Sequence, residues 1–207
     1  KVDVYSEAMI RLARTGFPYM YPYEQPSCDD YDPICTFHEP TESPLNDAEY
    51  PLVITTGRLP HFHHGTMRHA PFIRELMPAP ELRINPQTAA EYGIEHLDWV
   101  KITSRRGSSH ARAYLTQGIA PGVLITERFW NPECYDSTQE TITPGIEECG
   151  YNIMSADSFQ NPCFATNSYR AFTVKIEKCD RPERIWGESK EFEPFMPTLQ
   201  NEPVTEE

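Results

Sequence analysis

The sequence predicts a mainly β protein built around a closed or nearly closed β-barrel. About six short runs of alternating or β-branched apolar residues are spread between residues 52 and 178, and such runs are typical of half-buried strands. The helix signals are short. The 20 prolines are close to twice the usual share of about 5%, which favours turns and extended arms over long helices. A two-sheet sandwich is the alternative architecture.

Before the first strand, the sequence predicts one short helix and a long arm. The helix is expected over residues 3–15, because Ser6 can cap its start and Gly16 can end it. Residues 17–50 are rich in Pro, Asp and Tyr and follow neither a helical nor a strand period. We therefore expect an irregular arm that lies over a surface.

The barrel strands follow from the period-2 pattern and from the turns between them. They are expected over residues 52–55, 81–85, 99–103, 109–116, 123–126 and 171–178. A helix should follow the second strand, since Asn85 can cap it, Pro86 suits its first position and Gly93 its exit. The tight turn at Arg105-Arg106-Gly107 predicts a hairpin between the third and fourth strands.

The remaining segments are expected to be irregular. Residues 127–170 form a connection of more than 40 residues, and loops of that length inside a compact domain are usually functional or disordered. The end of the chain is polar and acidic. We expect three parts: residues 1–49 as a linker helix and arm from a preceding domain, residues 50–179 as the barrel, and residues 180–207 as an acidic tail.

Charge excludes some functions and localises another. The chain carries 18 Lys and Arg against 31 Asp and Glu, a net charge of −13, which argues against nucleic-acid binding. No stretch approaches the roughly 18 apolar residues of a membrane helix, so no membrane insertion by this chain is expected. Residues 51–130 alone are basic, at +3, and hold six of the seven His. That segment suits an anionic ligand, although acidic flanks that only keep the domain soluble would give the same pattern.

The clearest chemical motif follows the first barrel strand, at residues 55–68 (TTGRLPHFHHGTMR). A strand that ends in Thr-Gly-Arg offers backbone N–H groups, a hydroxyl and a guanidinium, which together suit an oxyanion. The His that follow, His61, His63 and His64, can instead ligate a metal ion, but no carboxylate occurs between Glu49 and Glu75 to complete a common ligand set. Each His can also simply satisfy backbone groups. No nucleophile elbow, P-loop or Rossmann pattern is present.

The six cysteines do not define a site or a compartment. They lie at positions 28, 35, 134, 149, 163 and 179, with no C-x-x-C pair and no zinc-type spacing. Scattered thiols of this kind fit a reducing compartment as well as an oxidising one. Localisation therefore stays open between the cytoplasm and the bacterial periplasm.

Several further motifs occur in a fixed order along the chain. They are YPL at 50–52 with TGR at 56–58 and His61, INPQTAA at 84–90 with GI at 93–94, Val100 with SRRG at 104–107, PG at 121–122, YNIM at 151–154 and SYR at 168–170. Their order resembles a known family, the C-terminal molybdopterin-dinucleotide-binding domain of the dimethyl sulfoxide reductase superfamily. Residues 1–16 resemble the linker that precedes that domain.

The resemblance implies a six-stranded double-psi β-barrel of the aspartate-decarboxylase-like kind, with short helices and long irregular arms. It implies a role in capping a molybdopterin guanine dinucleotide that carries Mo or W, within a larger oxidoreductase. It assigns cofactor binding to Thr56, Gly57, Arg58, His61, Phe62, His63, Thr66, Arg68, Asn152, Tyr169 and Arg170, and no catalytic or metal-ligating residue.

The family's metal-ligating side chain and iron-sulfur cysteines belong to earlier domains, so we expect an iron-sulfur cluster elsewhere in the full protein and no activity from this chain alone. The expected partners are the preceding domains of the same oxidoreductase and electron-transfer subunits. Two other functions stay open at this point. One is a free-standing, cupin-like metal barrel that uses His61, His63 and His64. The other is a noncatalytic interaction module that docks through the Tyr-rich arm at residues 19–31.

Overall fold

The computed structural model describes residues 4–15, 32–34, 36–37, 39–40, 42–67, 70–74, 76–77, 79–128, 150–155, 159–161, 166–167 and 170–182. The helices are α1 (Glu7–Thr15), α2 (Pro71–Arg74), α3 (Pro86–Glu91) and α5 (Tyr151–Met154). The strands are β1 (Leu52–Thr56), β2 (Glu81–Ile84), β3 (Trp99–Thr103), β4 (Ser108–Leu115), β5 (Val123–Thr126), β6 (Phe159–Asn161), β7 (Thr166–Asn167) and β8 (Phe172–Cys179). Within these residues, no helix has the length and apolar character needed to cross a bilayer.

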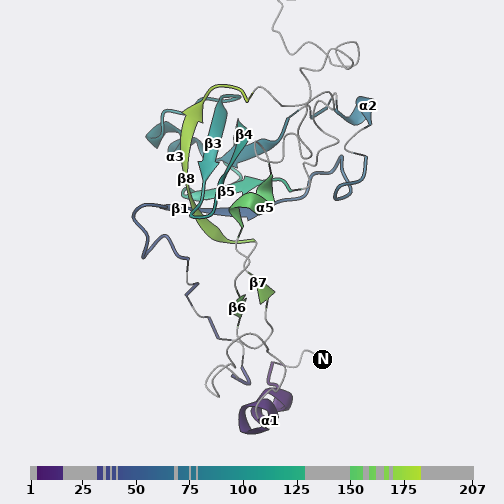
Figure 1. The fold of residues 1–207 in the computed structure, drawn as a ribbon, viewed down its shortest axis with the longest axis vertical. Helices are drawn as coiled ribbons and strands as arrows, with labels where there is room; N and C mark the ends of the chain where they lie inside the picture. The colour runs from purple at the N-terminus through teal and green to yellow at the C-terminus, as the bar shows by residue number, and fades with distance from the viewer. Residues whose placement is uncertain are drawn as a thin grey trace, which may run out of the picture.

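Six strands close into a barrel in the order β1-β5-β2-β4-β3-β8 (Figure 1). Two pairs are parallel, β1 with β5 and β2 with β4, and the other four contacts are antiparallel. Parallel partners cannot be joined by a hairpin, so the chain must cross over to form each of them. The expected six-stranded double-psi β-barrel is confirmed, and the two-sheet sandwich is not formed.

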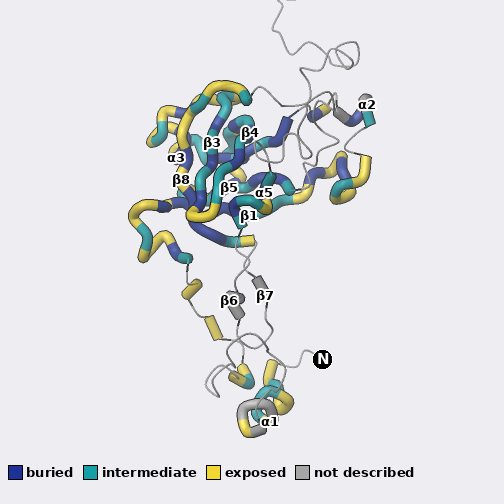
Figure 2. Tube along the Cα trace, in the orientation of Figure 1, coloured by how far each residue is buried: buried dark blue, intermediate teal, exposed yellow. Residues whose placement is uncertain are grey.

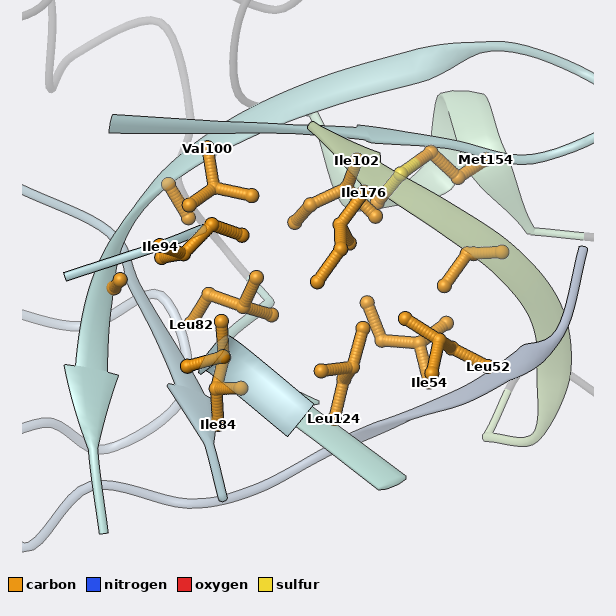
Figure 3. Packing of buried hydrophobic residues seen from close by; sticks show 14 of the residues in the cluster. Leu52, Ile54, Leu82, Ile84, Ile94, Val100, Ile102, Leu124, Met154 and Ile176 are labelled. Atoms are coloured by element: carbon orange, nitrogen blue, oxygen red, sulfur yellow. The ribbon is translucent and has the colours of Figure 1, made fainter. Parts of the chain in front are cut away.

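The core fills the inside of the barrel because each strand turns alternate residues inward. Leu82 and Ile84 of β2, and Val100 and Ile102 of β3, are at most 1% exposed. Figure 3 shows their side chains converging with those of Ile54 and Leu124 in one apolar cluster. The period-2 pattern thus predicted the six barrel strands correctly.

The helix after β2 has the predicted caps. The Asn85 side chain accepts a hydrogen bond from the Gln87 backbone N–H at 2.9 Å and donates to the Ile119 carbonyl at 2.7 Å. Gly93 follows the helix with a φ of +64°, in the left-handed region where glycine carries no steric cost. One side chain therefore caps α3 and ties it to the loop before β5.

Two other expectations need correction. The stretch 127–170 is not all loop, because it contains α5 and the paired strands β6 and β7. The first helix begins at Glu7 rather than at residue 3. Figure 1 shows α1, β6 and β7 on the same side of the barrel, with α1 farthest from it, and Figure 2 shows that the described residues of α1 are mostly exposed.

The described residues of the arm contain no regular helix or strand, as predicted, and residues 42–50 lie against the barrel. Ser43 and Tyr50 are buried there. The boundaries of the three expected parts of the chain stay predictions.

Candidate functional site

The site begins where β1 ends, at Gly57. The Gly57 N–H donates to the Thr126 carbonyl at 3.0 Å, which extends the parallel contact between β1 and β5 by one residue. A β-carbon at Gly57 would lie only 2.8 Å from Cγ2 of Ile125. The glycine thus suits the close approach of β1 to β5, and the next residue, Arg58, has an exposed side chain.

Residues 57–67, which we name the rim loop, are anchored by a second small core. Leu59 and Phe62 are buried with Ile73 and Met77 of the α2 region, and Trp99 packs against this cluster. These contacts hold the loop against the start of β3. They leave His61, His63 and His64 exposed.

The tip of the rim loop is a tight turn with two unusual backbone conformations. The Thr66 N–H donates to the His63 carbonyl at 2.9 Å, while His64 and Met67 have φ values of 56° and 66°. Left-handed conformations are uncommon for residues other than glycine and concentrate at ligand-binding and switch segments. The His63 and His64 rings lie 5.1 Å apart, so the tip presents two adjacent imidazoles.

A cleft of about 480 Å³ opens between the rim loop and the outer faces of β2 and β4. This volume is in the usual range for a small-molecule site. Its polar lining consists of His61, Glu81, Arg83, Tyr114 and Thr116, and its apolar lining includes Leu59, Leu76, Met77, Ile119 and Ile125. An aromatic ring, a hydroxyl and several charged groups therefore face one space.

A narrow notch adjoins this cleft at the end of β1. It is lined by Gly57, Arg58, Thr126 and Glu127 and shares Leu59, Glu81, Arg83 and Ile125 with the cleft. Arg58 and Arg83 thus face the same notch. Within the part of the chain that the structure describes, neither guanidinium has a hydrogen bond or an ion pair. Their donors are available to an anion.

Two titratable groups near the cleft are shifted by their surroundings. Burial raises the pKa of Glu81, against the opposing effect of the positive charges of Arg83 and Arg112. Loss of hydration lowers the pKa of His64, and the neighbouring charges of Arg58 and His63 lower it further. At the rim loop, neighbouring positive charge therefore adds to the loss of hydration in disfavouring protonation of His64.

The structure brings most of the predicted site residues together at the rim loop. Thr56, Gly57 and Arg58 mark the end of β1, and His61 lines the cleft. His63 and Thr66 form the exposed tip, whereas Phe62 is buried in the second core and anchors the loop. Arg68, Tyr169 and the Tyr-rich arm at 19–31 lie outside the described residues.

Asn152 and Arg170 come from other segments, α5 and the residues just before β8. Asn152 is exposed on α5, whose Tyr151 ring lies 5.6 Å from the Phe172 ring at the start of β8. Phe172 pairs with Ile54, so Arg170, two residues earlier, precedes β8 on the side where β1 ends. Neither residue lines the cleft or the notch described above.

Sequence reasoning missed several residues that line the cleft, chiefly Glu81 and Arg83 of β2 and Tyr114 and Thr116 at the end of β4. The alternation in β2 does predict that Glu81 and Arg83 face outward. It cannot show that β2 lies next to β5 and hence close to the rim loop, because that depends on the order of the strands. Among the residues described, no group of three or more His, Cys, Asp or Glu could hold a metal ion, and His61, His63 and His64 belong to that searched set.

The fold and the site together define a class of protein: a mainly β, closed six-stranded barrel with a cationic rim beside a ligand-sized cleft. The family model described as "Molydopterin dinucleotide binding domain" matches residues 52–155. That span includes every strand of the barrel except β8. The chain belongs to this family of cofactor-binding domains, which are parts of molybdenum and tungsten oxidoreductases.

Individual relatives are similar over the same region. The chain is 38% identical over 148 residues to the dopamine dehydroxylase of Eggerthella lenta, covering 69% of this chain and 14% of that protein. It is 42% identical over 83 residues to a formate dehydrogenase alpha subunit of Methanocaldococcus jannaschii, covering 39% of this chain and 12% of that protein. The chain therefore spans about one seventh or less of these relatives' length.

A solved structure shares the fold. The acetylene hydratase of Pelobacter acetylenicus superposes with a TM-score of 0.64 at 20% identity, covering 72% of this chain and 22% of that one. At that identity, the likeness supports the barrel fold and does not extend to the chemistry.

Proposed function

We propose that this chain holds a molybdopterin dinucleotide against the rim of its barrel, as the cofactor-capping part of a larger oxidoreductase. The observation that carries the proposal is that Arg58 and Arg83 share a notch next to the 480 Å³ cleft, with no ion pair or hydrogen bond to any described residue. Two guanidiniums that line one notch suit a diphosphate, since each can donate two parallel hydrogen bonds to an oxyanion.

The rest of the lining fits the other parts of such a cofactor. Tyr114 offers an aromatic face and a hydroxyl, and Thr116 and His61 can donate or accept hydrogen bonds. Glu81 can accept from ring N–H groups, and its raised pKa lets it keep a proton at a higher pH than an ordinary glutamate. The donor set therefore fits a diphosphate joined to a hydrogen-bonding ring system.

When bound, the cofactor's metal would supply the electron transfer, and the work of this chain is to bind and to orient. Arg58 and Arg83 neutralise the diphosphate. The rim loop shields one side, held by Leu59 and Phe62 in the second core. Asn152, from α5, and Arg170, just before β8, are proposed to contact the cofactor as well. The same proposal includes Mo or W as the metal and an iron-sulfur cluster elsewhere in the protein. It takes the preceding domains and electron-transfer subunits as partners, and it holds that this chain alone is inactive.

The test replaces each arginine in the full-length enzyme. Arg58→Ala and Arg83→Ala each remove charge-assisted hydrogen bonds worth about 1.5 to 3 kcal/mol, so the cofactor should dissociate about tenfold or more faster. Cofactor content after gel filtration is measured as bound metal and as released pterin. Arg181→Ala, a charge change at an exposed residue after β8, is the matched control. Full cofactor content in both test variants would contradict the proposal.

A further inference from the structure

Arg106 connects three segments that are far apart in the sequence. Its guanidinium forms a forked ion pair with Glu42 of the arm, with Nη–Oε distances of 2.5 and 3.0 Å. Its Nε donates to the Met154 carbonyl of α5 at 3.0 Å. The guanidinium also lies over the Phe172 ring, 5.6 Å from its centre, at the start of β8. One side chain therefore joins the arm, the β3–β4 turn, α5 and β8.

The turn that carries Arg106 is shaped to receive α5. The Ser104 hydroxyl donates to the same Met154 carbonyl at 2.8 Å and accepts from the Arg106 backbone N–H at 3.1 Å. A β-carbon at Gly107 would clash with Cγ2 of Ile153 and would lie 2.9 Å from the Ile153 carbonyl oxygen. Only glycine allows α5 to approach the turn so closely. We name Glu42, Ser104, Arg106 and Gly107, together with the Met154 carbonyl, the clasp.

The helix that the clasp contacts, α5, depends on contacts with other segments. A helix of four residues is too short to be stable without packing, and α5 has no side-chain cap at its start. Its Met154 carbonyl is instead satisfied by Ser104 and Arg106. Tyr151 and Met154 are buried in the main core, while Asn152 between them is exposed. Whatever fixes α5 therefore fixes the direction in which the Asn152 amide faces.

The arm completes the clasp by charge complementarity. Residues 42–50 contain three acidic residues and no basic one, and each acidic side chain meets a cation of the barrel. Glu42 pairs with Arg106, Asp47 with Arg105 at 2.6 Å, and Glu49 with Lys175 at 3.3 Å. The ion pair of Glu42 with Arg106 is the least exposed of the three, with the two side chains 15% and 27% exposed. It is also the one that reaches α5 through its partner.

We infer that Glu42 and Arg106 are positioning residues that hold α5, and with it Asn152, in place for the cofactor. This inference rests on the proposed function, since it gives Asn152 a ligand to face. It adds that the arm before the barrel takes part in cofactor retention without touching the cofactor. The class of ligand remains a diphosphate-linked pterin, held at one side by the rim loop and at the other by α5.

The experiment uses the full-length enzyme with four single variants and one double variant. Glu42→Gln keeps the shape of the side chain and removes the forked ion pair. Arg106→Lys keeps the charge but cannot reach both Glu42 and the Met154 carbonyl. Glu49→Gln is the matched control, because it breaks an ion pair of the same arm that does not touch the clasp. Asn152→Ala removes the amide itself.

Two readouts separate positioning from general stability: hydrogen exchange of the backbone amides at 151–155, and cofactor content after gel filtration. Glu42→Gln and Arg106→Lys should each speed exchange at 151–155 about tenfold, as expected for the loss of a charge-assisted contact. Cofactor content should fall toward that of Asn152→Ala. The double variant should be no worse than either single variant, because both break one unit. Glu49→Gln should match the parent enzyme.

The outcomes distinguish the two proposals. Unchanged exchange at 151–155 in Glu42→Gln and Arg106→Lys would overturn the clasp. So would faster exchange with full cofactor content, provided that Asn152→Ala loses cofactor. If Asn152→Ala and Arg58→Ala both retain full cofactor, the proposed function is wrong and the positioning role falls with it. If those two variants lose cofactor and the clasp variants do not, only the positioning role is wrong.

Discussion

The rim loop and the clasp use the same kind of side chain for opposite purposes. In the clasp, Arg106 is paired with Glu42, and the neighbouring Arg105 is paired with Asp47 of the arm. At the rim loop, Arg58 and Arg83 share a notch and form no ion pair or hydrogen bond with any residue the structure describes. An arginine with an internal partner stabilises the fold, whereas an arginine whose donors are available can bind an anion. The two sets of arginines should therefore respond differently to mutation.

The largest effect is expected from Gly107→Ala. Its new β-carbon would meet both the side chain and the backbone of Ile153, and the backbone cannot move without displacing α5. Overpacking of this kind costs about 1–3 kcal/mol. Gly57→Ala, at the rim loop, meets only the Ile125 methyl group and should cost less. Urea unfolding of the chain measures the loss of stability in both variants. Gly118→Ala is the control, since the atom nearest to a β-carbon added there would be Thr116 Oγ1, 3.4 Å away. Equal losses at 57 and 107 would contradict the comparison.

The next pair of variants compares an arginine that stabilises the fold with an arginine that is proposed to bind the cofactor. Arg106→Ala removes the ion pair with Glu42 and the hydrogen bond to the Met154 carbonyl, so it should lower the free energy of unfolding by about 1–2 kcal/mol after allowance for partial solvent exposure. Arg58→Ala removes no such contact among the described residues and should leave that free energy within about 0.5 kcal/mol. Urea unfolding without cofactor tests this contrast. A loss of stability in Arg58→Ala as large as that in Arg106→Ala would refute it.

The sequence predicted the barrel well and the clasp not at all, for a physical reason. Strands follow from a local period of two, so the strands expected over residues 81–85, 99–103 and 123–126 match β2, β3 and β5 to within one residue. A helix as short as α5 has no period to detect. Glu42 and Arg106 are 64 residues apart, and nothing local in a Pro-rich arm indicates which cation an acidic residue will meet. Arg83 was missed likewise, because its place beside the rim loop depends on strand order.

A third prediction compares the pH dependence of two carboxylates, Glu42 of the clasp and Glu81 of the cleft. The hydrogen bond and charge of Arg106 lower the pKa of Glu42. The stability that Glu42 contributes is therefore complete above its unfolded pKa, near 4.5, and is lost as the pH falls through the lower folded pKa. Burial raises the pKa of Glu81. Its ionisation therefore destabilises the folded chain as the pH rises from its unfolded pKa through the higher folded one.

Urea unfolding as a function of pH checks both signs. Relative to the parent chain, Glu42→Gln should be less stable near neutral pH and should lose that deficit as the pH falls below about 4.5. Glu81→Gln should become more stable relative to the parent as the pH rises above that value. If both variants change with pH in the same direction, the contrast between a paired clasp carboxylate and a buried cleft carboxylate is wrong.

The smallest effect is expected from the outermost ion pair of the arm. The Glu49 and Lys175 side chains are 61% and 45% exposed, and exposed pairs contribute about 0.2–1 kcal/mol, reduced further by salt. A double-mutant cycle with Glu49→Gln and Lys175→Met should give a coupling energy near the lower end of that range, and 0.5 M NaCl should abolish it. The same cycle with Glu42→Gln and Arg106→Lys should retain most of its coupling in salt, because that pair is largely shielded from solvent. If salt weakens both couplings equally, charge alone holds the arm and the depth of the clasp contributes nothing.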